Sequence, residues 1–199
     1  MRGRALAVLT IPLLVTSLSR PEPEAARAAP APAPAGTIRF TGRNLLFTAV
    51  GEFRRWRIRA ATVDDAVPER SRVEVEIDVA SLDTDNEQRD EHLRGPDFFD
   101  VARHPTASVV VESFRVIDAD HVEADVILVL HGSTRRFPMR FAIEDRAARR
   151  IAGRVVLRRS DFDLGSPASR WNPLSIDEEV EVRVEATVPP PTSSADAPS

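Results

Sequence analysis

Apolar and polar residues alternate with a period of two along most of this chain. Between residues 73 and 79, valine and isoleucine alternate with glutamate and aspartate, and residues 180–188 repeat the pattern. Because successive side chains of a strand point to opposite faces, each such run has one dry face and one wet face. This pattern favours an antiparallel sheet with one side against a core, since the strands of a parallel sheet are apolar on both faces.

The pattern predicts an all-β fold of eight strands joined by short polar turns. The predicted strands cover residues 38–50, 53–63, 73–79, 107–114, 122–130, 136–144, 150–158 and 180–188. One interval has helical signals, because Thr84 or Asp85 can cap a short helix that Gly95-Pro96 ends, so a helical insertion is expected at residues 85–101. An antiparallel eight-stranded up-and-down barrel removes exposed edges by closure, and an open two-sheet sandwich is the alternative.

The N-terminal residues 1–19 have the layout of a secretory signal peptide. Two arginines precede an uncharged run, Ala5 to Leu18, which is shorter than the roughly 20 residues that a membrane-spanning helix needs. Pro12 also interrupts this run, so no stable membrane span is expected. The cleavage site, and retention as an uncleaved anchor, stay open. The protein is therefore expected to be periplasmic or secreted.

Two segments flank the alternating region. Residues 20–36 are rich in proline and alanine and are predicted to form an extended linker. Residues 189–199 are rich in proline and serine and are predicted to be a disordered tail. The folded domain is therefore expected to cover residues 37–188, which is long enough to bury a core without disulfides.

The composition excludes several kinds of chemistry. The chain contains no cysteine, and all 27 of its basic residues are arginine. Disulfides, thiolate metal sites, cysteine nucleophiles and lysine Schiff bases are therefore ruled out. A net charge of -4 with both signs interspersed also argues against a nucleic-acid partner.

No catalytic or metal-binding pattern stands out. The histidines His92, His104, His121 and His131 show no ligand spacing typical of a metal site, so none is predicted. Serine residues occur in no nucleophile-elbow sequence. The sequence therefore predicts a protein that is not an enzyme and needs no catalytic cofactor.

The inward positions of the predicted strands are almost purely apolar. In an eight-stranded barrel such a lining either fills the interior or encloses one apolar ligand, and both alternatives stay open. The candidate ligand-lining residues are Trp56, Ile58, Val75, Ile77, Phe98, Phe99, Val109, Val111, Val126, Leu128, Phe137, Met139, Phe141, Val155 and Leu157.

Residues 81–113 are the most distinctive stretch and read SLDTDNEQRDEHLRGPDFFDVARHPTASVVVES. Three shorter segments flank it in order: VGEF at 50–53, LHGST at 130–134 and LRRSDF at 157–162. Together they resemble the YceI-like family of lipocalin-like, polyisoprenoid-binding proteins over residues 37–188. The resemblance implies a lipocalin-like barrel that encloses a long amphipathic lipid, either a polyisoprenoid or an isoprenoid quinone. His104 departs from the family at a position where a tyrosine often precedes the proline.

The leading hypothesis is an exported protein that sequesters or carries such a lipid. The alternatives are an exported structural or stress-associated barrel that binds nothing, and a lipid-modifying enzyme. Within the long motif, Arg89, Asp90 and His92 either clamp a lipid head group or hold a short helix against the barrel. The expected partner is an amphipathic lipid, and a homo-oligomer is left open.

Overall fold

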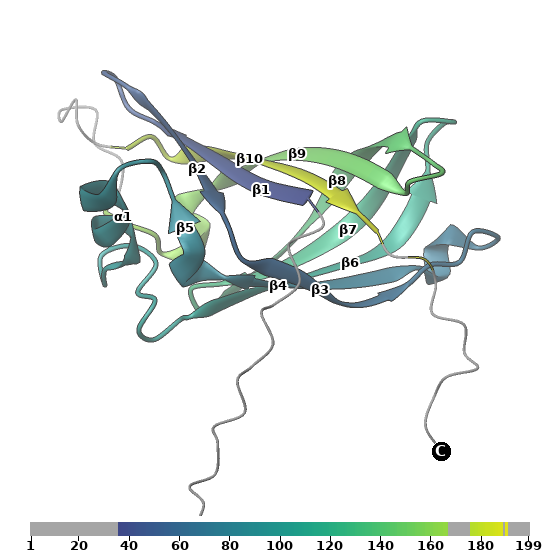
Figure 1. The fold of residues 1–199 in the computed structure, drawn as a ribbon, viewed down its shortest axis with the longest axis horizontal. Coiled ribbons are helices and arrows are strands. Elements are labelled where there is room, and N and C mark those ends of the chain that lie inside the picture. Colours follow the sequence, from purple (N-terminus) through teal and green to yellow (C-terminus); the bar gives the residue numbers. More distant parts are fainter. Residues whose placement is uncertain (1–35, 167–175, 189, 191–199) are drawn as a thin grey trace, which may run out of the picture. The chain divides into compact units, whose positions relative to one another are not determined.

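The computed structural model describes residues 36–166, 176–188 and 190. The predicted signal peptide, the predicted linker except residue 36, and the predicted tail except residue 190 lie outside the described residues. Ten strands form one antiparallel sheet (Figure 1). The strands are β1 (Gly36–Arg43), β2 (Thr48–Phe53), β3 (Trp56–Thr62), β4 (Arg72–Asp78), β5 (Leu82–Asp83), β6 (Thr106–Val116), β7 (His121–Leu130), β8 (Ser133–Asp145), β9 (Arg150–Arg158) and β10 (Glu179–Thr187). The helical elements are α1 (Glu87–Arg94) and three short 3-10 helices, η1 (Pro68–Arg70), η2 (Val79–Ser81) and η3 (Arg159–Phe162).

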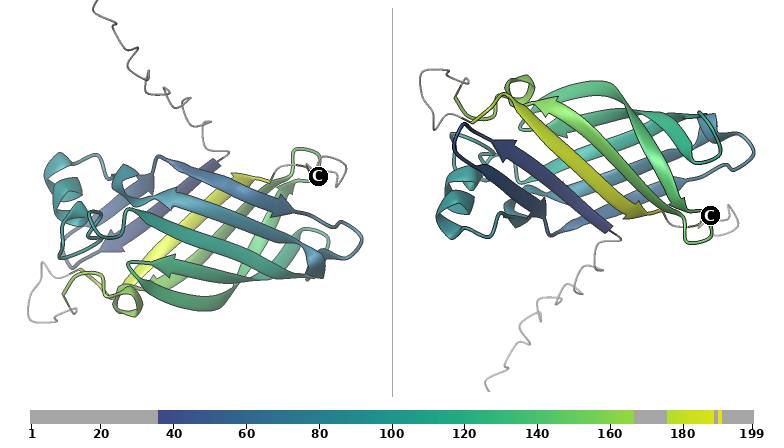
Figure 2. Two further views of the ribbon diagram at one scale, coloured as in Figure 1. Left: turned by 90° about the horizontal axis from the view of Figure 1, so that it is seen from below. Right: turned by 90° about the horizontal axis from the view of Figure 1, so that it is seen from above.

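The sheet curls into a half-barrel whose strand order is β3-β4-β6-β7-β8-β9-β10-β1-β2-β5 (Figure 2). The two strands at the edges of this order are β3 and β5. Each follows an inner strand directly along the chain, because β3 comes after β2 and β5 comes after β4. At these two junctions the backbone N–H of Arg54 donates to the Ser81 carbonyl at 3.1 Å, and that of Asp78 donates to the Arg55 carbonyl at 2.9 Å. These two hydrogen bonds link the segment β2–β3 to the segment β4–β5, where the two edges of the curled sheet meet.

The prediction of eight strands is wrong by two. Residues 38–50, expected to form one strand, contain β1 and part of β2, because a turn separates them. Within that turn the Asn44 side-chain oxygen accepts hydrogen bonds from the backbone of Leu46 and Phe47, both at 2.9 Å. The second extra strand is β5, which pairs only through two residues with β2.

The helical insertion lies where it was expected, although its cap is one residue later than predicted. Asn86 caps α1, since its side-chain oxygen accepts from the backbone N–H of Arg89 at 2.9 Å. The buried Asp90 carboxylate accepts from both the backbone N–H and the hydroxyl of Thr84, and Arg94 donates to the Leu82 carbonyl at 2.6 Å. These bonds hold α1 against β5, so the distinctive motif fixes a helix over one end of the barrel.

The most completely buried large side chains of the core lie at the α1 end of the domain. They are Val79, Leu82 and Phe162, and they come from η2, β5 and η3. Together with their neighbours they form a continuous apolar cluster that closes this end of the curled sheet. Among the described residues, no helix is both long and apolar enough to span a membrane.

Candidate functional site

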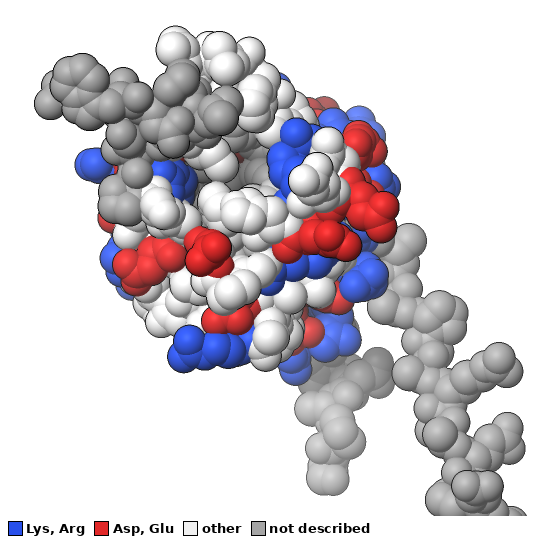
Figure 3. Space-filling view, turned by 90° about the vertical axis from the view of Figure 1, so that its left-hand side faces the viewer, with Lys and Arg blue, Asp and Glu red and all other residues white. Residues whose placement is uncertain are grey.

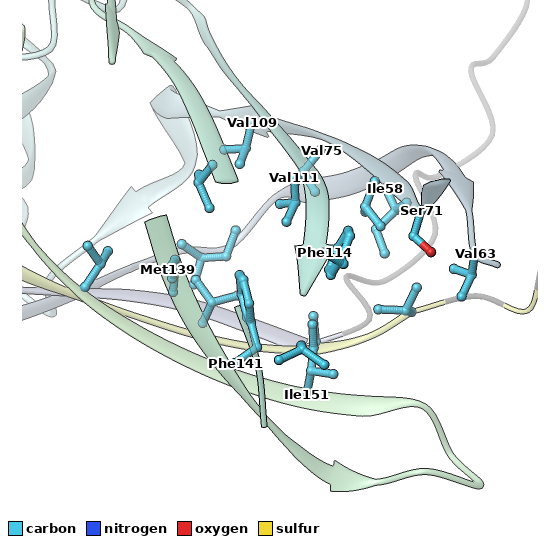
Figure 4. A pocket seen from close by; sticks show the side chains of 18 of the residues that line it. Ile58, Val63, Ser71, Val75, Val109, Val111, Phe114, Met139, Phe141 and Ile151 are labelled. Carbon is cyan, nitrogen blue, oxygen red and sulfur yellow. The ribbon is translucent and has the colours of Figure 1, made fainter. Parts of the chain in front are cut away.

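The curled sheet encloses an apolar cavity of about 550 Å³ (Figure 4). Its walls are inward-facing side chains of β1–β4 and β6–β10, which alternate along most of these strands with residues on the outer face. The volume lies within the range of about 300–1,000 Å³ typical of small-molecule sites. The interior is therefore not filled by its own side chains, which disfavours the structural barrel that binds nothing.

Thirteen of the fifteen predicted lining residues line this cavity, and whether they contact a lipid stays a prediction. Phe98 and Phe99 are the two that lie elsewhere, at the α1 end. The Phe99 ring packs edge-on against Phe53 at a centroid distance of 6.0 Å, and the Phe98 ring packs against His92 at 5.1 Å. They belong to the packed core, because the loop after α1 carries them away from the sheet interior.

A glycine in β9 gives the cavity part of its shape. Gly153 pairs with Phe141 of β8, and a Cβ atom there would lie 2.6 Å from the Met139 methyl carbon and 2.8 Å from the Phe141 ring. These distances are too short for real Cβ contacts. The two side chains can therefore lean against β9 only because residue 153 has no side chain.

The end of the cavity away from α1 carries a polar rim that the periodicity did not reveal. The polar and charged lining residues are Asp64, Asp65, Ser71, Asp118, Arg146 and Arg149. All six come from the loops β3–β4, β6–β7 and β8–β9, where strand alternation no longer applies. The Arg149 guanidinium lies 3.5 Å from the Asp65 carboxylate and so links two of these loops. The cavity thus offers charged and hydroxyl groups at one end and, deeper inside, apolar side chains together with the Trp56 indole.

Arginines on the outer face of the sheet are paired with acidic residues. Arg57 and Arg59 both donate to Glu76 at 2.5 Å, and the hydrogen bond from Arg59 is the main cause of a lowered pKa of that carboxyl. Hydrogen bonds from Arg136 and Arg115 likewise lower the pKa of Asp125. The basic stretch at residues 54–59 is therefore a solvated strand face, and at the α1 end both signs are interspersed as well (Figure 3).

The cavity lining holds few groups that could act as an acid or base. All four histidines lie within the described residues, and none of them lines the cavity. The carboxylates that line it belong to the rim, where Asp65 and Asp118 are exposed. The Trp56 indole N–H is buried and has no hydrogen-bond partner among the described residues, but an indole does not transfer protons at neutral pH. This arrangement suits binding better than catalysis.

The sequence matches the YceI-like domain over residues 32–188, which covers most of the chain. This chain belongs to the YceI-like family. The match confirms the resemblance seen in the motifs at residues 81–113 and their flanking segments. A curated relative, a UPF0312 protein of Pseudomonas savastanoi pv. phaseolicola, is 35% identical over 85 residues. That match spans 43% of this chain and 44% of the relative, so the chain spans less than half of that protein's length.

Solved structures support the same fold. BcnA of Burkholderia cenocepacia aligns with a TM-score of 0.68 at 18% identity, covering 75% of this chain and 94% of BcnA. A polyisoprenoid binding domain from Saccharophagus degradans aligns with a TM-score of 0.58 at 18% identity, covering 77% of this chain and 93% of that domain. At these identities the similarity shows a shared fold, and a lipocalin-like barrel is consistent with it.

Proposed function

We propose that this YceI-like domain is a non-catalytic binding protein that holds one long amphipathic lipid of the isoprenoid type. The observation that carries the proposal is the apolar cavity of about 550 Å³, which has a polar rim at one end and a packed core at the other. A long hydrocarbon tail would fill the apolar part, and a polar head group would lie at the rim. Such a site needs no catalytic group, because burial of the tail supplies the affinity.

The isoprenoid class is supported by the Saccharophagus degradans domain, which shares the fold and is described as polyisoprenoid binding. A polyprenol and an isoprenoid quinone both fit the proposal, since each combines a branched tail with one polar end. The proposal also places the protein in the periplasm or outside the cell, with the signal-peptide pattern of residues 1–19 as its support.

Titration with a fluorescent prenyl probe tests this function. The purified protein should bind the probe with one site per chain, and an unlabelled polyprenol or isoprenoid quinone should displace it. A straight-chain fatty alcohol of equal carbon number is the matched competitor, because it buries a similar area without the methyl branches. Absence of probe binding would overturn the binding function, and equal displacement by the fatty alcohol would overturn the isoprenoid preference.

A further inference from the structure

Three side chains that can bind metal ions gather at the α1 end of the domain, outside the cavity. They are Asp100, His104 and His131, and the ligand atoms that they offer lie within 4.8 Å of one another. Asp100 and His104 lie in the loop between α1 and β6, whereas His131 lies in the turn between β7 and β8. The sequence predicted no metal site, because His131 is far from the other two residues along the chain.

We propose that Asp100, His104 and His131 bind a divalent transition-metal ion, and that Zn²⁺ suits the site. Two imidazoles and one carboxylate are ligands that Zn²⁺ accepts, and three protein ligands leave a fourth position for water. With metal–ligand bonds of about 2.0–2.1 Å, tetrahedral ligand atoms lie roughly 3.3 Å apart. The three side chains therefore need to close by about 1.5 Å at most, which rotamer adjustment can supply.

The hydrogen bond of His131 prepares its ring for a metal. Nδ1 of His131 lies 3.0 Å from the backbone carbonyl of Phe162, a residue that is 2% exposed. Because a carbonyl only accepts hydrogen bonds, Nδ1 must donate its proton, and Nε2 keeps a free lone pair. Histidine ligands of metal ions usually donate their second nitrogen to a carbonyl or carboxylate in this way, which fixes the tautomer and the ring orientation.

Backbone contacts hold the other two side chains in place. The backbone N–H of His104 donates to the Asp100 carbonyl at 2.8 Å, which closes a turn that brings both side chains to one side. The His104 ring packs against the His131 ring at a centroid distance of 4.7 Å. Gly132, with φ of +77°, leaves room for this ring, since a Cβ atom there would lie 3.3 Å from Cε1 of His104.

The charge balance at the site favours a cation. Asp100 has a side chain that is only 12% exposed, and its one ion-pair partner among the described residues is Arg103 at 3.6 Å. The Arg103 side chain is 79% exposed, so this pair contributes little. Removing a carboxylate from water with so weak a partner costs folding free energy, and a divalent ion beside Asp100 would offset that cost.

Metal binding here would stabilise the domain. The three ligands come from the loop after α1 and from the β7–β8 turn, and the hydrogen bond to Phe162 extends the connection to η3. A bound ion would therefore tie these three segments together at the packed end of the barrel. None of the three ligands lines the cavity, so metal binding at this site can be tested independently of lipid binding.

Cobalt spectroscopy on the full chain, free of any affinity tag, tests the site. The wild-type protein should bind one Co²⁺ per chain with the strong visible absorption of a four-coordinate ion, and Zn²⁺ should abolish that absorption. Asp100→Asn and His104→Gln should each weaken Co²⁺ binding by at least about a hundredfold, because each removes a ligand rather than an outer partner. His121→Gln is the matched control, since His121 pairs with Asp118 at the opposite end of the barrel.

Thermal melting with and without Zn²⁺ separates loss of binding from loss of folding. Zn²⁺ should raise the Tm of the wild type and of His121→Gln, but not that of Asp100→Asn or His104→Gln. The proposal is overturned if the wild type binds no Co²⁺, or if the Asp100 and His104 variants bind it as tightly as the wild type. Equal loss in His121→Gln would also overturn it.

Discussion

Two neighbouring valines of β9 offer a sharp test of which face holds the ligand. Val155 lines the cavity, whereas Val156 lies on the outer face with 50% of its surface exposed. Phenylalanine has about four more carbons than valine, so Val155→Phe should displace about four tail carbons. At about 0.8 kcal/mol per buried methylene, the loss is ~3 kcal/mol, or roughly 200-fold in Kd.

The matched variant Val156→Phe adds the same atoms to the outer face and should leave lipid binding unchanged. Its unfolding free energy should change by less than about 0.5 kcal/mol, as is usual for surface substitutions. Val155→Phe should also fold, because the cavity of about 550 Å³ has room for the larger ring. Probe titration measures both affinities, and urea denaturation confirms folding. A folded Val155→Phe protein that binds the probe as tightly as the wild type would refute the placement of the ligand.

Three further predictions concern stability. The buried Arg159 guanidinium donates to the carbonyls of Leu164, Ile176 and Asp177, so Arg159→Ala should lower the unfolding free energy by about 3 kcal/mol in urea denaturation, whereas Ala at the exposed Arg158 should not. An Arg159→Ala protein as stable as the wild type would contradict this role. Gly153→Val should cost about 1–3 kcal/mol by the same assay, because its side chain would collide with Met139 and Phe141, and an unchanged stability would show that the two side chains move aside freely. The pKa of Asp125 is lowered in the folded state by Arg136 and Arg115, so its stabilising effect is present above the unfolded pKa of about 3.9 and lost as the pH falls through the folded value. The Tm of Asp125→Asn should therefore fall less than that of the wild type between pH 5 and pH 2, and parallel Tm curves would count against the pairing.

The alternation of apolar and polar residues predicted the cavity walls well, because a strand that is buried on one face carries an apolar residue at every second position. It placed Val155 on the inner face and left Val156 outside, and the structure has them so. The same reasoning failed at the β1–β2 turn, where the apolar residues Leu45 and Leu46 extend the strand pattern. Both are exposed, at 81% and 66%, because the Asn44 side chain turns the backbone there.

Features formed by separate loops could not be predicted in this way. Asp65 and Arg149 meet at the rim although 84 residues separate them, and neither lies in a periodic run. Asp100 and His104 lie in one loop, but the third candidate ligand, His131, comes from another turn, so the three residues form no ligand pattern along the chain. The sequence predicts Phe98 and Phe99 as lining residues, but the chain path after α1 places them in the core.

Mass spectrometry of the lipid that co-purifies with the full chain tests the central claim most directly. The protein should be produced with residues 1–19 in a bacterium that makes isoprenoid lipids, purified without detergent, and extracted with organic solvent. The account predicts one isoprenoid lipid per chain in the wild type and in Val156→Phe, and a strongly reduced amount in Val155→Phe. A wild-type protein that carries no lipid and takes up no prenyl lipid when one is added would contradict it.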